Sequence, residues 1–177
     1  MSTLDATVDH WNALERLYRE ASDILSSVPE LEAQARWTES IALCREAAIR
    51  FPLLANEIST LSASDVDPAV IAYATKTCQY MKHCEDLFDR FASYFAYKKD
   101  YTESFPTNEG LVASAIRFLL GMRMTSKQRA AKKRLDQMNN KLAETVTENG
   151  VERSVLNGDR DYLYKMLSEK YGMEFEH

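Results

Sequence analysis

Eight lysines and arginines gathered between residues 117 and 141 are the side chains in this sequence best suited to bind a partner. They share the stretch with one acidic residue, Asp136, so the segment carries a charge of +7 in a chain of net charge −5. Lysine and arginine bind acidic partners, and they displace counterions when the partner is a nucleic acid. The sequence therefore predicts a contact surface made of Arg117, Arg123, Lys127, Arg129, Lys132, Lys133, Arg134 and Lys141.

The second half of this basic segment is predicted to lie on a helix. Thr125 and Gln128 have the spacing of a capping box, which places the first helical residue at Ser126. At 100° per residue, a buried seam through Leu135 leaves three basic side chains pointing away from the body of the protein and three on one flank. The outward ones are Arg129, Lys132 and Lys133, and the flanking ones are Lys127, Arg134 and Lys141.

Two interpretations of the basic segment follow from the sequence. In one, it contacts a macromolecular partner, either an acidic protein surface or the phosphates of a nucleic acid. In the other, it docks on the acidic remainder of the same chain, where residues 1–116 hold 18 acidic and 10 basic side chains. No helix-turn-helix, zinc-knuckle or RNA-recognition motif accompanies the basic residues, so a nucleic-acid contact would be independent of base sequence.

Residues for catalysis or metal binding are few. The chain has three histidines and three cysteines, without Cys-x-x-Cys or His-Glu-x-x-His spacing. His83 and Cys84 are adjacent, but on a helix they point about 100° apart and are not expected to share an ion. We therefore predict no catalytic residue, no metal and no cofactor. An enzyme or ligand-binding bundle whose site is assembled across helices remains the alternative.

The element that must position these residues is a long central helix at about 67–99. Apolar side chains recur along it at alternating steps of four and three, which is typical of a helix with one buried stripe. Asp67 is suited to cap its start, with Pro68 in the first turn. Tyr73, Tyr80 and Tyr94 follow one edge of the stripe, and this spacing favours a margin of the core over a partner-binding surface.

Helical patterns also precede and follow the central helix. Residues 4–27 form one amphipathic stretch, and a second begins near residue 29 and crosses Pro52, where it either kinks or breaks. Beyond the loop around Pro106, a short helix is expected from Leu111 to Met122. The basic helix then ends at residues 149–150, and a last helix covers about 160–171 before Gly172.

These patterns together predict an all-α protein, an antiparallel helical bundle of five to seven helices in a single domain over residues 1–177. The bundle core is expected at about 4–99, the basic helical segment at about 108–149 and the C-terminal helix at about 160–171. The N-terminal residues lack the pattern of a secretory signal, and no apolar run is long enough to cross a membrane. Three cysteines cannot all pair within the chain. We therefore expect a cytoplasmic protein that does not use a membrane.

The function that these observations favour is a non-enzymatic, cytosolic interaction module whose basic segment binds a macromolecular partner. Such a module would be an accessory or regulatory subunit, or an inhibitor, of a nucleoprotein complex. Direct, sequence-independent binding of nucleic acid through residues 117–141 is the alternative. Long apolar stripes can also close a bundle between two copies of a chain, so a homodimer is a further expectation.

Overall fold

The computed structural model describes residues 3–33, 36–105 and 124–172. These residues fold into helices, and there is no strand among them. The helices are α1 (Thr3–Ser26), α2 (Val28–Ala33), α3 (Trp37–Thr60), α4 (Pro68–Glu103) and α6 (Ser126–Tyr171). The prediction of an all-α protein is confirmed for the described part of the chain.

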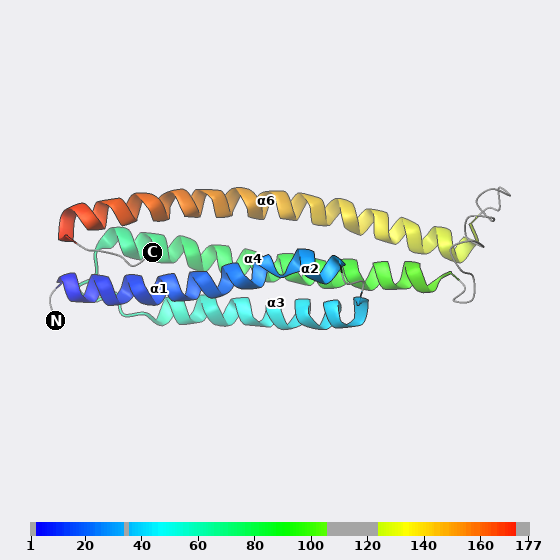
Figure 1. Ribbon diagram of the computed structural model, residues 1–177, viewed down its shortest axis with the longest axis horizontal. Helices are drawn as coiled ribbons and strands as arrows, with labels where there is room; N and C mark the ends of the chain where they lie inside the picture. The colour runs from blue at the N-terminus through cyan, green and yellow to red at the C-terminus, as the bar shows by residue number, and fades with distance from the viewer. Residues whose placement is uncertain (1–2, 34–35, 106–123, 173–177) are drawn as a thin grey trace.

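Four helices, α1, α3, α4 and α6, pack together along their lengths (Figure 1). Successive ones run in opposite directions, so the bundle is antiparallel, as predicted. The predicted central helix is α4, because it packs against each of the other three. Asp67 caps its start as predicted, with its side chain accepting a hydrogen bond from the amide of Ala69. The helix continues to Glu103, a few residues beyond its predicted end.

The prediction of five to seven helices in the bundle is wrong, because only four pack together in the described residues. The largest difference is at the C-terminus, where the sequence predicts separate helices at 126–149 and 160–171. The structure has one helix, α6, which passes through both Gly150 and Gly158. The short helix predicted from Leu111 to Met122 lies outside the described residues.

Long-range packing explains why α6 is continuous. A glycine inside a helix costs about 1 kcal/mol relative to alanine, so two glycines weaken the helix without forbidding it. Asn149, Leu156 and Leu163 lie seven residues apart on either side of these glycines, and all three are buried. Burial of this stripe against the rest of the bundle stabilises the helical conformation through both predicted breaks.

The stretch predicted to begin near residue 29 contains two helices, the six-residue α2 and the longer α3. Pro52 lies inside α3, which remains one helix. Proline removes one backbone hydrogen bond from a helix. The buried side chains of Ala48, Phe51 and Ala55 flank Pro52 in the sequence, and their packing stabilises α3 despite that loss.

The apolar core lies mainly among α1, α3 and α4. Its large buried side chains include Trp11 and Leu14 from α1 and Phe51 from α3. Phe51 contacts Phe88 of α4 with ring centroids 5.2 Å apart. The helix α6 adds three leucines to this core, Leu156, Leu163 and Leu167. The predicted apolar stripes are therefore buried within one copy of the chain, and this packing does not require a second copy.

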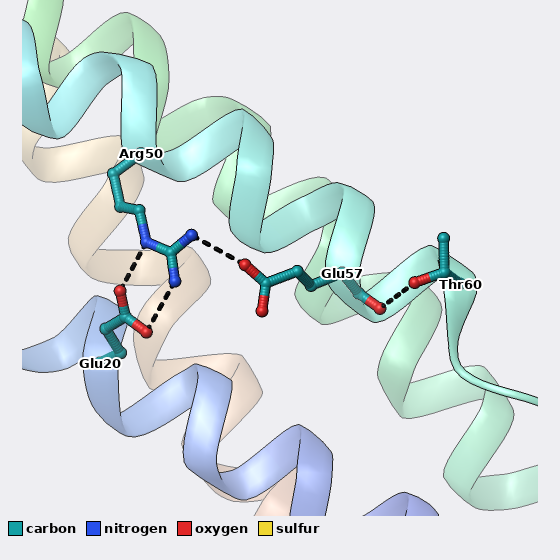
Figure 2. A network of polar contacts seen from close by, with 4 residues as sticks. All are labelled: Glu20, Arg50, Glu57 and Thr60. Carbon is teal, nitrogen blue, oxygen red and sulfur yellow. Dashed lines mark hydrogen bonds and ion pairs between the residues drawn. The ribbon is translucent and has the colours of Figure 1, made fainter.

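An ion-pair cluster joins α1 to α3 on the surface of the bundle (Figure 2). Nε and Nη2 of Arg50 donate to the two carboxylate oxygens of Glu20 at 2.6 and 2.9 Å. Nη1 donates to Glu57 of the same helix at 2.7 Å. The hydrogen bond from Arg50 lowers the pKa of Glu20. All three side chains are partly exposed, so the cluster aligns the two helices more than it stabilises the fold.

Candidate macromolecule-binding surface

The basic residues of α6 begin at a well-defined helix start. The side chain of Thr125 accepts a hydrogen bond from the amide of Gln128, and Oε1 of Gln128 accepts one from the amide of Thr125. The predicted capping box is therefore confirmed. Nε2 of Gln128 also donates to the carbonyl of Ser104, just beyond the end of α4. The first turn of α6 is thus tied to the last turn of α4.

The N-terminal part of α6 lies along α4. The yellow part of α6 and the end of α4 continue past the end of α3 (Figure 1). The seam in this region is thin, as the sequence predicts, because Ala131, Leu135 and Met138 are only partly buried. Leu142 is the first buried leucine of α6. A helix with so little apolar contact leaves most of its circumference in solvent.

The described basic residues of this segment are all exposed. Arg129, Lys132 and Lys133 share the side of α6 opposite its seam, and we call these three residues the basic face. Lys127, Arg134 and Lys141 lie on one flank of the seam. Arg117 and Arg123, the two remaining predicted contact residues, lie outside the described residues.

Ion pairing leaves most of these charges available. Nζ of Lys132 donates to Asp136, one turn along α6, at 2.6 Å. The hydrogen bond to Asp136 raises the pKa of Lys132, so this lysine stays charged at neutral pH. Within the described part of the chain, no acidic side chain forms an ion pair with the other five, which are Lys127, Arg129, Lys133, Arg134 and Lys141.

A shallow, open depression lies along the basic face. It is lined by the three basic-face residues together with Asp136, Gln137 and Asn140. Cationic, anionic and amide groups therefore stand side by side on this surface. Such a mixture can form ion pairs and hydrogen bonds with a complementary protein surface.

In the part of α6 after Lys141, most basic side chains face the bundle instead of solvent. This inward placement was not predicted from the sequence. Three of the four basic side chains in this part, Arg153, Arg160 and Lys170, turn toward the bundle, where they bond to Ser22, Glu15 and Asp67. Arg153 and Arg160 lie seven residues apart, in the period of the buried stripe. This shared seven-residue period is the signal from which Arg153 and Arg160 could have been predicted to face the other helices.

The aromatic edge of α4 is part of the core, as its spacing predicts. Tyr73 and Tyr80 are buried beneath α6 and α1. The hydroxyl of Tyr80 donates to Asn149 at 3.3 Å, and Asn149 donates to Sγ of Cys84. Burial raises the pKa of Tyr80 and raises the pKa of Cys84 to about 11. Both groups are neutral at physiological pH and serve as packing groups.

His83 and Cys84 do not form a site together. Cys84 is buried in the seam, whereas His83 is exposed and its Nδ1 lies 2.8 Å from a carboxylate oxygen of Glu152 on α6. Across residues 3–33, 36–105 and 124–172, no three His, Cys, Asp or Glu side chains are grouped as metal ligands. None of the described helices is long and apolar enough to cross a membrane.

The chain matches no protein-family model, no curated protein and no solved structure. Its class is therefore defined by its fold, an all-α antiparallel bundle with one helix, α6, that is largely polar.

Proposed function

We propose that this protein is a non-enzymatic helical interaction module that binds an acidic macromolecular partner through the basic face of α6. The observation that carries the proposal is that Arg129 and Lys133 are exposed and have no ion-pair partner among the described residues. The two residues lie one turn apart. Like charges at this spacing repel each other in a helix, and the acidic groups of a partner would relieve that repulsion.

The charge pairing elsewhere in the bundle supports a partner outside the chain. If the basic segment docked on its own acidic body, acidic side chains of α1, α3 or α4 would lie beside it. Instead, acidic residues that pair between helices do so with other cations. Such pairs include Glu15 with Arg160, Glu20 with Arg50 and Glu32 with Lys98.

An acidic protein surface fits the basic face better than a chain of phosphates. Asp136 lies within the surface and repels phosphate, whereas a protein partner can supply both acidic groups and hydrogen-bond donors. From Lys127 to Lys141 the basic residues extend over about 21 Å of helix, which is suited to a small protein contact. A module of this kind would act as an accessory or regulatory subunit, or as an inhibitor, of a larger complex.

Sequence-independent binding of nucleic acid is the second candidate function. It is favoured by the exposure, along one stretch of helix, of five cations that have no ion-pair partner among the described residues. Cations in such a row release counterions from a phosphate backbone without reading bases. Both candidate functions use the same basic residues of α6. One binding experiment with acidic-peptide and nucleic-acid probes can therefore separate them.

The experiment is a fluorescence anisotropy titration of the full chain with three labelled probes at low and near-physiological salt. The probes are a glutamate-rich peptide, single-stranded DNA and double-stranded DNA. We expect the peptide to bind and its affinity to fall with salt. Replacing both Arg129 and Lys133 by Glu should weaken peptide binding by about tenfold or more, because two attractions become repulsions.

A matched variant with the same change of charge controls for the total charge of the chain. Arg19 of α1 and Lys82 of α4 are exposed and lie off α6, so Arg19→Glu with Lys82→Glu should bind as the wild type does. Equal loss of binding in both double variants, or failure of every probe to bind at low salt, would overturn the proposal. Tighter binding of DNA, with a log–log salt slope of about −0.9 per phosphate contacted, would replace it by the second candidate.

A further inference from the structure

An exposed apolar stripe lies on the second half of α6, away from the basic face. Val151, Val155 and Tyr162 expose 60%, 56% and 70% of their surfaces. At 100° per residue these three side chains fall within about 40° of one another, and Gly158 lies beside them. We call these four residues the apolar stripe. A contiguous exposed stripe of this kind is typical of a protein contact, unlike single exposed apolar residues.

The charges at the two ends of the apolar stripe follow an order that suits a second copy of the same helix. On this side of α6 the order is Lys141, Glu144, Glu148, the stripe, Lys165 and Glu169. All five charged side chains are exposed, and the described residues provide no ion-pair partner for any of them. Read in the reverse direction, each positive position meets a negative one. A parallel pairing would instead place like charges together.

We propose that two copies of this chain pair antiparallel through the apolar stripes of α6, about a two-fold axis beside Val155. In this register Val155 contacts Val155 of the second copy, and Val151 lies opposite Gly158. A Cβ built on Gly158 would meet no atom within 4 Å, so the space above this glycine is open to receive a valine side chain.

The same register pairs the charges. Lys165 and Glu144 each lie about 16 Å along the helix from the axis, on opposite sides, so they meet across the interface. Lys141 and Glu169 each lie about 21 Å from the axis and meet in the same way. The two-fold axis repeats both pairs, which makes the interface isologous. The aliphatic parts of the lysines would extend the apolar contact.

This interface leaves the basic face free. The second copy of α6 ends at Tyr171, which in this register lies opposite residue 138. Arg129 and Lys133 therefore lie beyond the end of the second helix, and the dimer carries one basic face near each end. The pairing does not depend on the function proposed for those faces.

The test is the mass of the full chain in solution, measured by sedimentation from micromolar to hundreds of micromolar concentrations. The chain has a mass of 20.3 kDa, and we expect a concentration-dependent species of twice that mass. A monomer at every concentration would overturn the proposal.

Val155→Glu should weaken dimerisation by about tenfold or more, because it places two carboxylates together across the axis. Ile49→Glu on α3 is the matched control, because Ile49 is 68% exposed and lies outside the stripe; a control that dissociates equally would count against the proposal.

Charge reversal tests the antiparallel register. Lys165→Glu should weaken the dimer, because Glu144 of the second copy then faces a like charge. The double variant Lys165→Glu with Glu144→Lys should restore it, since the exchanged pair attracts again. Failure of the double variant to restore dimerisation would overturn the register. Far-UV circular dichroism, with the same helical signal for every variant, shows that each substitution acts on pairing and not on folding.

Discussion

Asp67 and Lys170 lie 103 residues apart in the sequence and form a 2.6 Å ion pair at one end of the bundle. The side chain of Asp67 is only 5% exposed. Its Oδ1 accepts the amide of Ala69 at the start of α4, and its Oδ2 also accepts the hydroxyl of Tyr171. One carboxylate thus caps the central helix and holds the last turn of α6 beside it.

The pH dependence of stability should reflect this carboxylate. Burial would raise the pKa of Asp67, but hydrogen bonds from Lys170, the Ala69 amide and Tyr171 outweigh burial and lower the pKa. A group whose pKa is lower in the folded state stabilises the protein above its ordinary pKa, here about 4. That stabilisation is lost as the pH falls through the folded-state pKa.

Asp67→Ala should therefore lower the free energy of unfolding at neutral pH by about 1–2 kcal/mol, because an N-cap is lost. It should also flatten the decline of stability in acid. Asp67→Asn keeps a capping group but not the charge. At neutral pH it should lower the free energy of unfolding less than Asp67→Ala does, and in acid its stability should fall as little as that of Asp67→Ala. Urea unfolding at a series of pH values measures both. An acid limb as steep in both variants as in the wild type would contradict this account.

The attachment of α6 to α1 should depend on Glu15 and Arg160. Nε and Nη2 of Arg160 donate to the carboxylate of Glu15 at 2.6–2.9 Å. Arg160 is partly exposed, so solvent reduces the strength of the pair. A double-mutant cycle with Glu15→Gln and Arg160→Gln should give a coupling energy of about 1 kcal/mol. Additive effects of the two substitutions would show that this ion pair does not help to hold α6 against α1.

A glycine substitution tests whether α6 is continuous. Gly150 is exposed, has no positive φ, and a Cβ built there meets no atom within 4 Å. Gly150→Ala should therefore raise the free energy of unfolding by about 0.5–1 kcal/mol. Gly172→Ala is the contrasting variant, because Gly172 ends α6 with φ of 64° and alanine there should destabilise by about 1 kcal/mol. Destabilisation by Gly150→Ala would indicate that the helix breaks at residue 150.

The three cysteines should differ in reactivity. Burial raises the pKa values of Cys44 and Cys84 to about 11, so both thiols are protonated and shielded at pH 8. Cys78 is only partly buried. Iodoacetamide followed by mass spectrometry should modify Cys78 first in the native protein, and all three after unfolding. Early modification of Cys44 would show that the core between α3 and α4 opens readily.

Local features of the fold were well predicted from the sequence because they depend on near neighbours. The cap at Asp67, the capping box at Thr125 and Gln128, and the left-handed stop at Gly172 each involve residues within one turn of a helix. The long seam of α4 was predictable for a similar reason, since its period is set by helix geometry. Outward placement of Arg129 and Lys133 follows from that same geometry.

The continuity of α6 was not predictable in this way. Gly150 and the Asn157–Gly158 pair are ordinary signals for a helix end, and nothing near them in the sequence opposes that reading. What opposes it is the burial of Leu156 and Leu163, together with the bond from Tyr18 to Asn157 at 2.7 Å. Those partners come from α1 and α4, more than sixty residues away in the sequence.

The amino-acid sequence by itself thus determined that this protein is helical, where most of its helices begin, and that its basic residues gather along one stretch. Those properties follow from composition and from helical periodicity. Tertiary structure alone decided that residues 126–171 form a single helix and that Arg153, Arg160 and Lys170 turn inward. The physical reason is that the direction of a charged side chain depends on the group with which it bonds. The partners of these cations are Ser22, Glu15 and Asp67, which come close to α6 only when the helices pack together.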